Sequence, residues 1–174
     1  MRTVRASAVV MGIMLLVSTS WAQETNKVDS LIVDKVEIEK GGKAAVKVYL
    51  VNSQDLAGLT IPLGLAGKGV SIDSLSFAGS RIEYIKMKPV TVAKDKKQVV
   101  FGAITMTEDY LPAGRGLMAT LYVSADSDFA GKCVIDTATI GPASVLYTKK
   151  DSYNYVPAFS SGSVSLKDPS KKTK

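Results

Sequence analysis

The sequence has no histidine among its 174 residues, and this absence removes several classes of function at once. Histidine is the commonest general base, the usual partner of a nucleophilic side chain and a ligand of most catalytic zinc ions. A hydrolase that uses two carboxylates needs none, and the adjacent Glu108 and Asp109 are the obvious candidate pair. Neighbouring residues of a strand point to opposite faces, so we interpret the pair as part of a polar loop. The sequence therefore predicts a protein that is not an enzyme.

Cysteine occurs once, so the chain cannot form an internal disulfide. Cys133 lies in the apolar segment 132–135, which predicts a small buried side chain rather than a reactive thiol. The stability of the fold must then come from its hydrophobic core.

Tryptophan also occurs once, as Trp21, in a segment that we expect to be removed. A sugar-binding surface in the remaining chain would have to use tyrosine rings, and three cluster near the C-terminal strands. Tyr147, Tyr153 and Tyr155 could form such a platform, although rings at a strand edge more often cover the core.

Signals for metal, cofactor and nucleic-acid binding are weak or missing. Asp126 and Asp128 could offer oxygens to a calcium ion, but without further spaced ligands they favour a turn. No glycine-rich phosphate loop precedes a helix, and we expect neither a metal nor a cofactor. The net charge is +6, yet no basic stripe alternates with aromatic residues, so nucleic acid is not an expected partner.

The N-terminus has the three parts of a secretory signal peptide. Arg2 and Arg5 precede an apolar run over residues 6–17, and the small residues Ser20 and Ala22 suit a signal peptidase. A membrane span needs roughly 20 apolar residues, more than this run provides. We therefore predict cleavage after Ala22, a secreted or periplasmic location, and no membrane attachment once the signal is cleaved.

The rest of the chain is a succession of short apolar segments separated by glycine, asparagine, aspartate and serine. Alternation with a period of two, as in Leu59, Ile61 and Leu63, indicates strands with one buried face. We expect a linker over 23–30, one domain over 31–166 and a disordered basic tail over 167–174. The fold class predicted is an all-β, jelly-roll sandwich of about nine strands. The strand candidates are 31–39, 43–52, 59–65, 70–77, 81–87, 90–93, 99–106, 117–123, 133–140, 144–148 and 162–166.

Two stretches resemble cohesin domains, the receptor modules of extracellular enzyme assemblies. The first is residues 42–65, in which a valine- and leucine-rich strand, a polar turn and the strand Leu-Thr-Ile-Pro-Leu-Gly-Leu follow one another. The second is residues 98–122, which end in the strand Gly-Leu-Met-Ala-Thr-Leu-Tyr. The resemblance extends over residues 33–166. It implies a nine-stranded sandwich with one flat sheet face that binds a dockerin-like protein module.

The implied binding face lies on the strands 59–65 and 99–106. Its candidate residues are Thr60, Pro62, Gly102, Ile104 and Met106. The strand 99–106 is apolar on both faces, so it either is covered twice or presents an apolar surface to a partner. Pro62 cannot donate a ladder hydrogen bond, which predicts a bulge or a sheet edge there. The alternative partner is a polysaccharide bound by the three tyrosines.

Overall fold

The computed structural model describes residues 28–105 and 109–168. The signal segment 1–22 with Trp21, most of the expected linker, Met106, Glu108 and the tail from residue 169 lie outside this range. Within it, strands predominate and no helix is long and apolar enough to cross a membrane.

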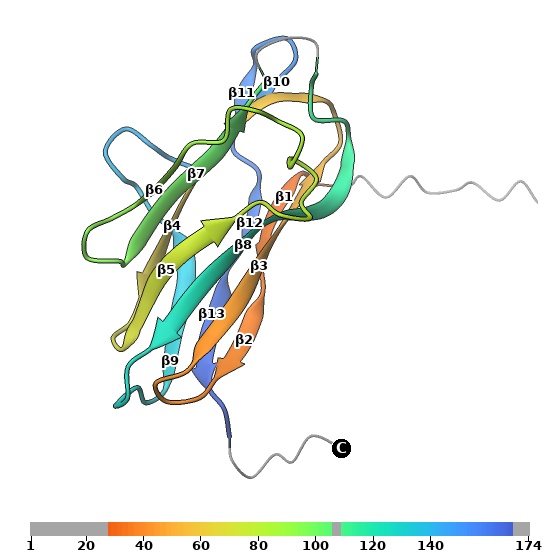
Figure 1. Ribbon diagram of the computed structural model, residues 1–174. Helices are drawn as coiled ribbons and strands as arrows, with labels where there is room; N and C mark the ends of the chain where they lie inside the picture. The colour runs from red at the N-terminus through yellow and green to blue at the C-terminus, as the bar shows by residue number, and fades with distance from the viewer. Residues whose placement is uncertain (1–27, 106–108, 169–174) are drawn as a thin grey trace, which may run out of the picture.

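Two sheets pack face to face, and this arrangement confirms the predicted all-β sandwich in a single domain (Figure 1). The first sheet has the order β12 (Ala158–Ser160), β1 (Ser30–Val33), β3 (Lys43–Asn52), β8 (Gly114–Ala125) and β5 (Val70–Ser76). The second has the order β11 (Asn154–Tyr155), β10 (Leu146–Lys149), β4 (Leu56–Ala66), β9 (Lys132–Thr137), β13 (Gly162–Leu166) and β2 (Lys35–Ile38). On its other side, β4 pairs with β7 (Gln98–Ile104), and β7 pairs with β6 (Val90–Val92).

The core lies between the sheets and follows the alternation of the sequence. In β4, the side chains of Leu59, Ile61 and Leu63 have at most 4% of their surface exposed. The residues between them face outward from the second sheet, because successive side chains of a strand alternate between its faces. Cys133 is also fully buried, which confirms that it is a core residue, and burial raises the pKa of its thiol.

The predicted strand 31–39 is divided between the two sheets at Asp34. Before it, β1 pairs with β3 and β12 in the first sheet; after it, β2 pairs with β13 in the second. The Asp34 amide donates to the carbonyl of Lys47 at 2.9 Å, which anchors the crossing point. The pairings β1–β12 and β2–β13 are both parallel.

The prediction of a strand over 81–87 is wrong. Hydrogen bonds of the i to i+3 type turn the chain there, including the bond from the amide of Ile85 to the carbonyl of Ile82 at 3.0 Å. Ile82 and Ile85 are both buried, a spacing of three that matches a turn rather than a pleated strand. The short strands β11 and β12 were not predicted.

Pro62 occupies neither a bulge nor a sheet edge, so this expectation is also wrong. Strand β4 has partners on both sides, with β7 along one side and β10 followed by β9 along the other. Pro62 falls between the last residue paired with β10, Thr60, and the first paired with β9, Leu63. Proline has no N–H to donate, and at Pro62 neither β10 nor β9 is paired with β4. A proline in this central strand therefore leaves no ladder hydrogen bond unmade.

Candidate functional site

Four of the five predicted face residues lie together on the outer side of β4 and β7. Thr60 is directly opposite Gly102, Pro62 is opposite Val100, and Ile104 is opposite Gly58. We call this outer surface, with Thr60, Pro62, Gly102 and Ile104, the β4–β7 face. The fifth residue, Met106, lies outside the described residues.

Gly102 and Pro62 shape the face but offer little surface to a partner, since both are buried. A Cβ atom at Gly102 would come within 2.2 Å of the carbonyl oxygen of Leu59. The Gly102 amide also donates to the carbonyl of Pro89 at 3.2 Å. Glycine is thus required by the close approach of the strands, and the accessible part of the face is at the end of β7.

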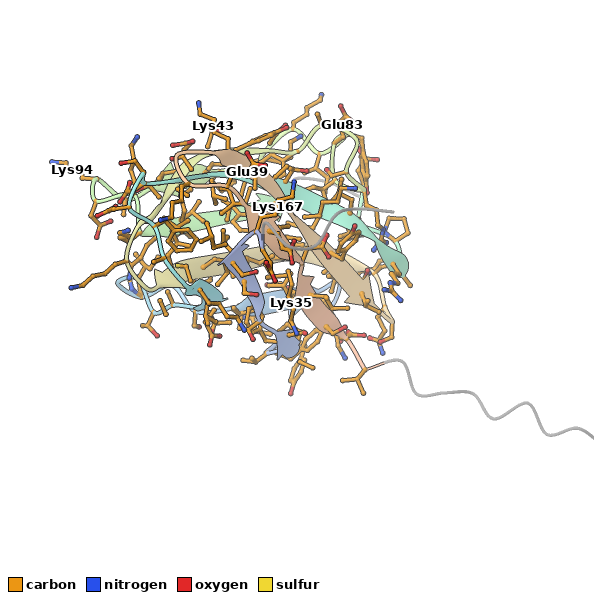
Figure 2. All side chains as sticks on the ribbon, turned by 90° about the horizontal axis from the view of Figure 1, so that it is seen from below. Lys35, Glu39, Lys43, Glu83, Lys94 and Lys167 are labelled. Atoms are coloured by element: carbon orange, nitrogen blue, oxygen red, sulfur yellow. The ribbon has the colours of Figure 1, made fainter. Side chains whose placement is uncertain are left out.

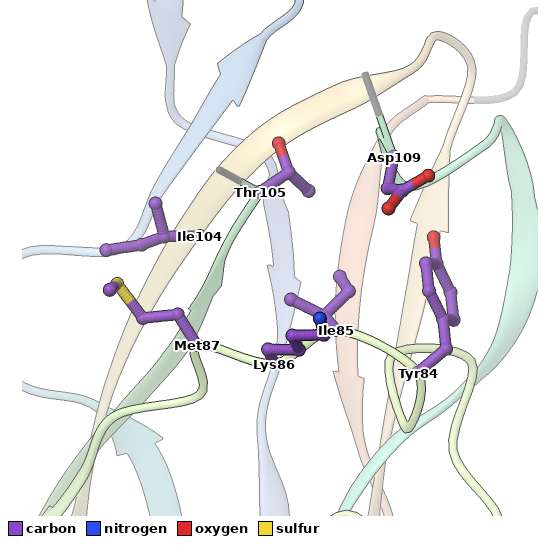
Figure 3. Close-up of a pocket in the computed structure, with 7 residues that line it drawn as sticks. All are labelled: Tyr84, Ile85, Lys86, Met87, Ile104, Thr105 and Asp109. Carbon is purple, nitrogen blue, oxygen red and sulfur yellow. The ribbon is translucent and has the colours of Figure 1, made fainter. Parts of the chain in front are cut away.

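At that end, a shallow hollow of about 170 Å³ opens between β7 and the segment that precedes β6 (Figure 3). Ile104 and Met87 lie side by side there, joined by a bond from the Ile104 amide to the Met87 carbonyl at 3.0 Å. Ile104 is 44% exposed and Met87 is 42% exposed. The lining residues are Tyr84, Ile85, Lys86, Met87, Ile104, Thr105 and Asp109.

The segment 77–89 that carries Tyr84 and Met87 is held by Arg81. Its guanidinium donates to the side-chain oxygen of Asn52 at 2.9 Å and to the carbonyl of Pro112 at 2.6 Å. Its aliphatic part lies over Gly116, where an added Cβ would come within 2.5 Å of the Arg81 Cδ. Burial lowers the pKa of Arg81. Two further bonds hold the segment, from the Tyr84 hydroxyl to the Tyr110 carbonyl and from the Lys88 Nζ to the Glu83 carbonyl.

The sequence does not reveal the contribution of Tyr84 and Met87, because its pattern over 81–87 predicts a strand. The pair Tyr84 and Ile85 next to the lysines could have suggested a covering loop, but its position over β7 depends on contacts of Arg81 with residues 29 to 31 positions away.

The three candidate tyrosines of a sugar platform do not form a common exposed surface. Tyr147 is fully buried, and its hydroxyl donates to the carbonyl of Ser30 at 3.2 Å. The Tyr155 ring packs edge-on against Tyr147 at 5.7 Å, and its hydroxyl bonds to the carboxylate of Asp29. Burial raises the pKa of both hydroxyls. Of the three, Tyr153 alone is well exposed, at 61%. The Tyr147 ring lies in the core and the Tyr155 ring packs against it.

Two lysines at the end of β10 lie over tyrosine rings. The Nζ of Lys149 lies 5.3 Å from the ring centres of both Tyr153 and Tyr155. The Nζ of Lys150 lies 4.9 Å from the ring centre of Tyr110. We call these two lysines the lysine rim.

Of the acidic candidates, the structure describes Asp109, Asp126 and Asp128. Asp109 lies at the hollow, as its exposed polar edge, whereas Glu108 is outside the described residues. Asp126 is in a turn, where its carbonyl accepts the amide of Phe129 at 3.1 Å. In the part of the chain that the structure describes, no three aspartate, glutamate or cysteine side chains are placed to hold a metal ion.

Solved structures show that the fold is the cohesin fold. The third cohesin ScaC of Acetivibrio cellulolyticus, solved with a dockerin, superposes with a TM-score of 0.70 and 14% identity over 81% of this chain and 100% of that one. The cohesin of a type I cohesin–dockerin complex from Clostridium thermocellum superposes with a TM-score of 0.68 and 16% identity, over 80% of this chain and 99% of that one. A cohesin of Archaeoglobus fulgidus described as non-cellulosomal superposes with a TM-score of 0.66 and 12% identity, over 82% of this chain and 94% of that one. No family profile and no curated protein matches the sequence. The predicted resemblance to cohesins is thereby confirmed at the level of the fold.

Proposed function

We propose that this protein is a non-catalytic binding module that docks a dockerin-type protein partner on its β4–β7 face. The observation that carries the proposal is the pair of exposed apolar side chains, Ile104 and Met87, beside a hollow on an otherwise well-packed sandwich. Several proteins with the same fold were solved as cohesin–dockerin complexes. Large apolar side chains that a soluble protein leaves exposed in one place often mark a contact surface.

The surroundings of the hollow suit a protein interface. Such interfaces have a few buried apolar anchors, which carry most of the affinity, inside a polar rim that stays wet. Here Ile104, Met87 and Tyr84 would be the anchors. Lys86 and Asp109 at the hollow, together with the lysine rim, would be the polar margin. A partner with apolar side chains flanked by carboxylates would complement this pattern.

Export is the second part of the proposal. The basic, apolar and small-residue sections of residues 1–22 support a secretory signal peptide that delivers the domain outside the cytoplasm. An exported receptor module would meet its partner in the periplasm or outside the cell.

The experiment is a binding series with residues 23–174 and purified dockerin modules, starting with those solved with Acetivibrio and Clostridium cohesins. Proteins captured from the native extracellular fraction would extend the panel once they are identified and purified. Titration calorimetry would compare the wild type with Ile104→Asp. Val28→Asp is the matched control, since Val28 is 68% exposed and precedes the first sheet.

We expect a dockerin-type module to bind the wild type and the control alike. Ile104→Asp should weaken binding about thirtyfold or more, as expected for loss of an anchor worth about 2 kcal/mol. Unchanged affinity of Ile104→Asp would remove the β4–β7 face from the proposal. Failure of every dockerin-type module to bind would remove the partner class.

A further inference from the structure

The outer side of the first sheet differs in chemistry from the β4–β7 face. Strands β3, β8 and β5 lie side by side in this sheet, at the front of Figure 1. Among the described residues of these strands, Tyr122 is the one large hydrophobic side chain that is exposed, at 44%. Tyr49 of β3 is half-buried on the same side, so Tyr122 is the most exposed ring of a mainly polar surface.

The neighbours of Tyr122 leave its ring accessible. Across the ladder it is opposite Ala45 on β3 and Ser74 on β5, and both side chains are too small to cover a phenol ring. Lysines lie over the rings of Tyr110, Tyr153 and Tyr155, but among the described residues none lies over Tyr122. Tyr122 can therefore offer a ring face to a ligand, which the other tyrosines in lysine contacts do not.

Two ammonium groups flank this ring. Lys43 and Lys47 are exposed on the same side of β3, two residues before and two residues after Ala45, and Figure 2 shows Lys43 pointing away from the sandwich. Their Cα atoms are roughly 13 Å apart, because a strand rises about 3.3 Å per residue. Neither forms a salt bridge with a described residue. A negatively charged chain that ran along β3 could meet both lysines while it crossed Tyr122.

The sheet supplies further polar groups and little opposing charge. Thr120 is opposite both Lys47 and Ser76, so hydroxyls continue the row beside the ring. Strands β3, β8 and β5 contain three basic residues and one acidic residue, Asp73. Asp73 lies at the bulge of β5, and its carboxylate accepts the hydroxyl of Ser124 at 3.0 Å. Ser124 is directly opposite Lys43, so this one carboxylate lies on the same face, at the Lys43 end of the row.

We propose that this surface binds an acidic polysaccharide, with a sugar ring stacked on Tyr122 and carboxylates paired with Lys43 and Lys47. An open sheet with one exposed ring and spaced cations suits an extended polymer rather than a small enclosed ligand, which would need a concave pocket. Paired cations select against neutral polymers, and the hydroxyl row matches the hydroxyls of sugars. The site is on the opposite sheet from the β4–β7 face and is independent of the proposed partner docking.

Affinity gel electrophoresis of residues 23–174 tests the proposal, with polygalacturonate in one gel and neutral hydroxyethylcellulose in a second. The wild type should be retarded by polygalacturonate alone. Tyr122→Ala should weaken this apparent affinity about tenfold or more, whereas Tyr122→Phe, which retains a ring, should stay close to the wild type. Lys43→Ala and Lys47→Ala should each weaken binding and reduce its dependence on salt.

Matched controls are Tyr153→Ala and Lys149→Ala, which remove the same groups from the β10–β11 hairpin and should bind as the wild type does. Ile104→Asp should also retain the polysaccharide while losing a dockerin-type partner, so the two proposals fail separately.

No retardation by polygalacturonate, or equal retardation of Tyr122→Ala, would overturn the inference. Equal retardation by the neutral polymer would overturn its acidic specificity. A polyglutamate gel gives the last distinction, since equal retardation there would mean simple ion exchange and no sugar site. Circular dichroism of each variant would establish that it is folded before its mobility is compared.

Discussion

The Arg81 guanidinium donates to the side-chain oxygen of Asn52 across 2.9 Å and joins the segment 77–89 to the end of β3. Asn52 is 2% exposed, and its amide in turn donates to the carbonyls of Gln54 and Pro112. One arginine thus positions the segment that forms one side of the hollow and satisfies a buried polar side chain.

Arg81→Met should keep the aliphatic packing over Gly116 but remove these hydrogen bonds. The side-chain oxygen of Asn52 would be left buried without this donor, which costs about 1–3 kcal/mol. Urea denaturation should show this loss in the free energy of unfolding, with Arg115→Met, an exposed arginine, as the control. Equal free energies of unfolding for the two variants would mean that the hydrogen bonds of Arg81 do not stabilise the domain.

Gly102→Ala should destabilise the domain because its Cβ would approach the Leu59 carbonyl oxygen far inside normal contact. The expected cost is about 1–3 kcal/mol, as for other overpacked interiors. Gly58→Ala is the control on the facing strand, since its nearest neighbour would be an ordinary 3.4 Å away. Thermal melting would compare the two, and a similar effect at both positions would argue against the strand contact as the cause.

Alkaline pH should destabilise the domain through Tyr155. Burial, with its bond to Asp29, raises its pKa in the folded state above the ordinary value of 10.0. The stabilising contribution is fully present below pH 10 and is lost as the pH rises toward the folded pKa, since the unfolded state loses its proton first. Tyr155→Phe should therefore show a smaller fall in denaturant midpoint between pH 9 and about pH 11 than the wild type.

Tyr153→Phe is the control for this alkaline effect, because Tyr153 is largely exposed. It should follow the wild-type curve. A Tyr155→Phe curve that also follows the wild type would assign the alkaline loss to other groups.

Cys133 should resist thiol reagents in the folded protein. Its side chain is fully buried and burial raises its pKa, so the reactive thiolate is scarce and shielded. Reaction with Ellman's reagent should be slow in buffer and rapid in denaturant, with one thiol titrated per chain. Rapid labelling without denaturant would indicate an opening of the sandwich near β9.

Expression with the native N-terminus in an exporting host tests the predicted signal peptide. The mature protein should begin at Gln23, and its intact mass would reveal the cleavage. Recovery of the uncut chain in the cytoplasm would contradict export while leaving the fold unaffected.

The fold was predictable to a large extent because the buried positions recur with a period of two. The segment 43–52 matches β3 at both ends, and Leu59, Ile61 and Leu63 face the core as their alternation requires. Where the prediction failed, long-range contacts decided the structure. Ile82 and Ile85 resemble strand residues, but the contacts of Arg81 and the i to i+3 turns place that segment beside the end of β7.

The candidate site was predictable in part. The sequence grouped Thr60 with Gly102 and Ile104 on one face, and the structure places them on paired strands, with Ile104 exposed. Sequence could not place Met87 beside Ile104, because a single bridge outside the named strands joins them. It also grouped Tyr147 with Tyr153, although the first is buried by the chain near Ser30, more than one hundred residues away.

The two parallel pairings of the split N-terminal strand determine how the domain would carry a mechanical load. A pull between the start of β1 and the end of β13 would draw β2 and β13 lengthwise past each other, because parallel strands point their beginnings and ends in the same direction. Their hydrogen bonds would then be loaded together rather than opened one by one. The pair β1–β12 would resist in the same shearing direction. Such a geometry is suited to keep the domain folded under a pull applied at these two points.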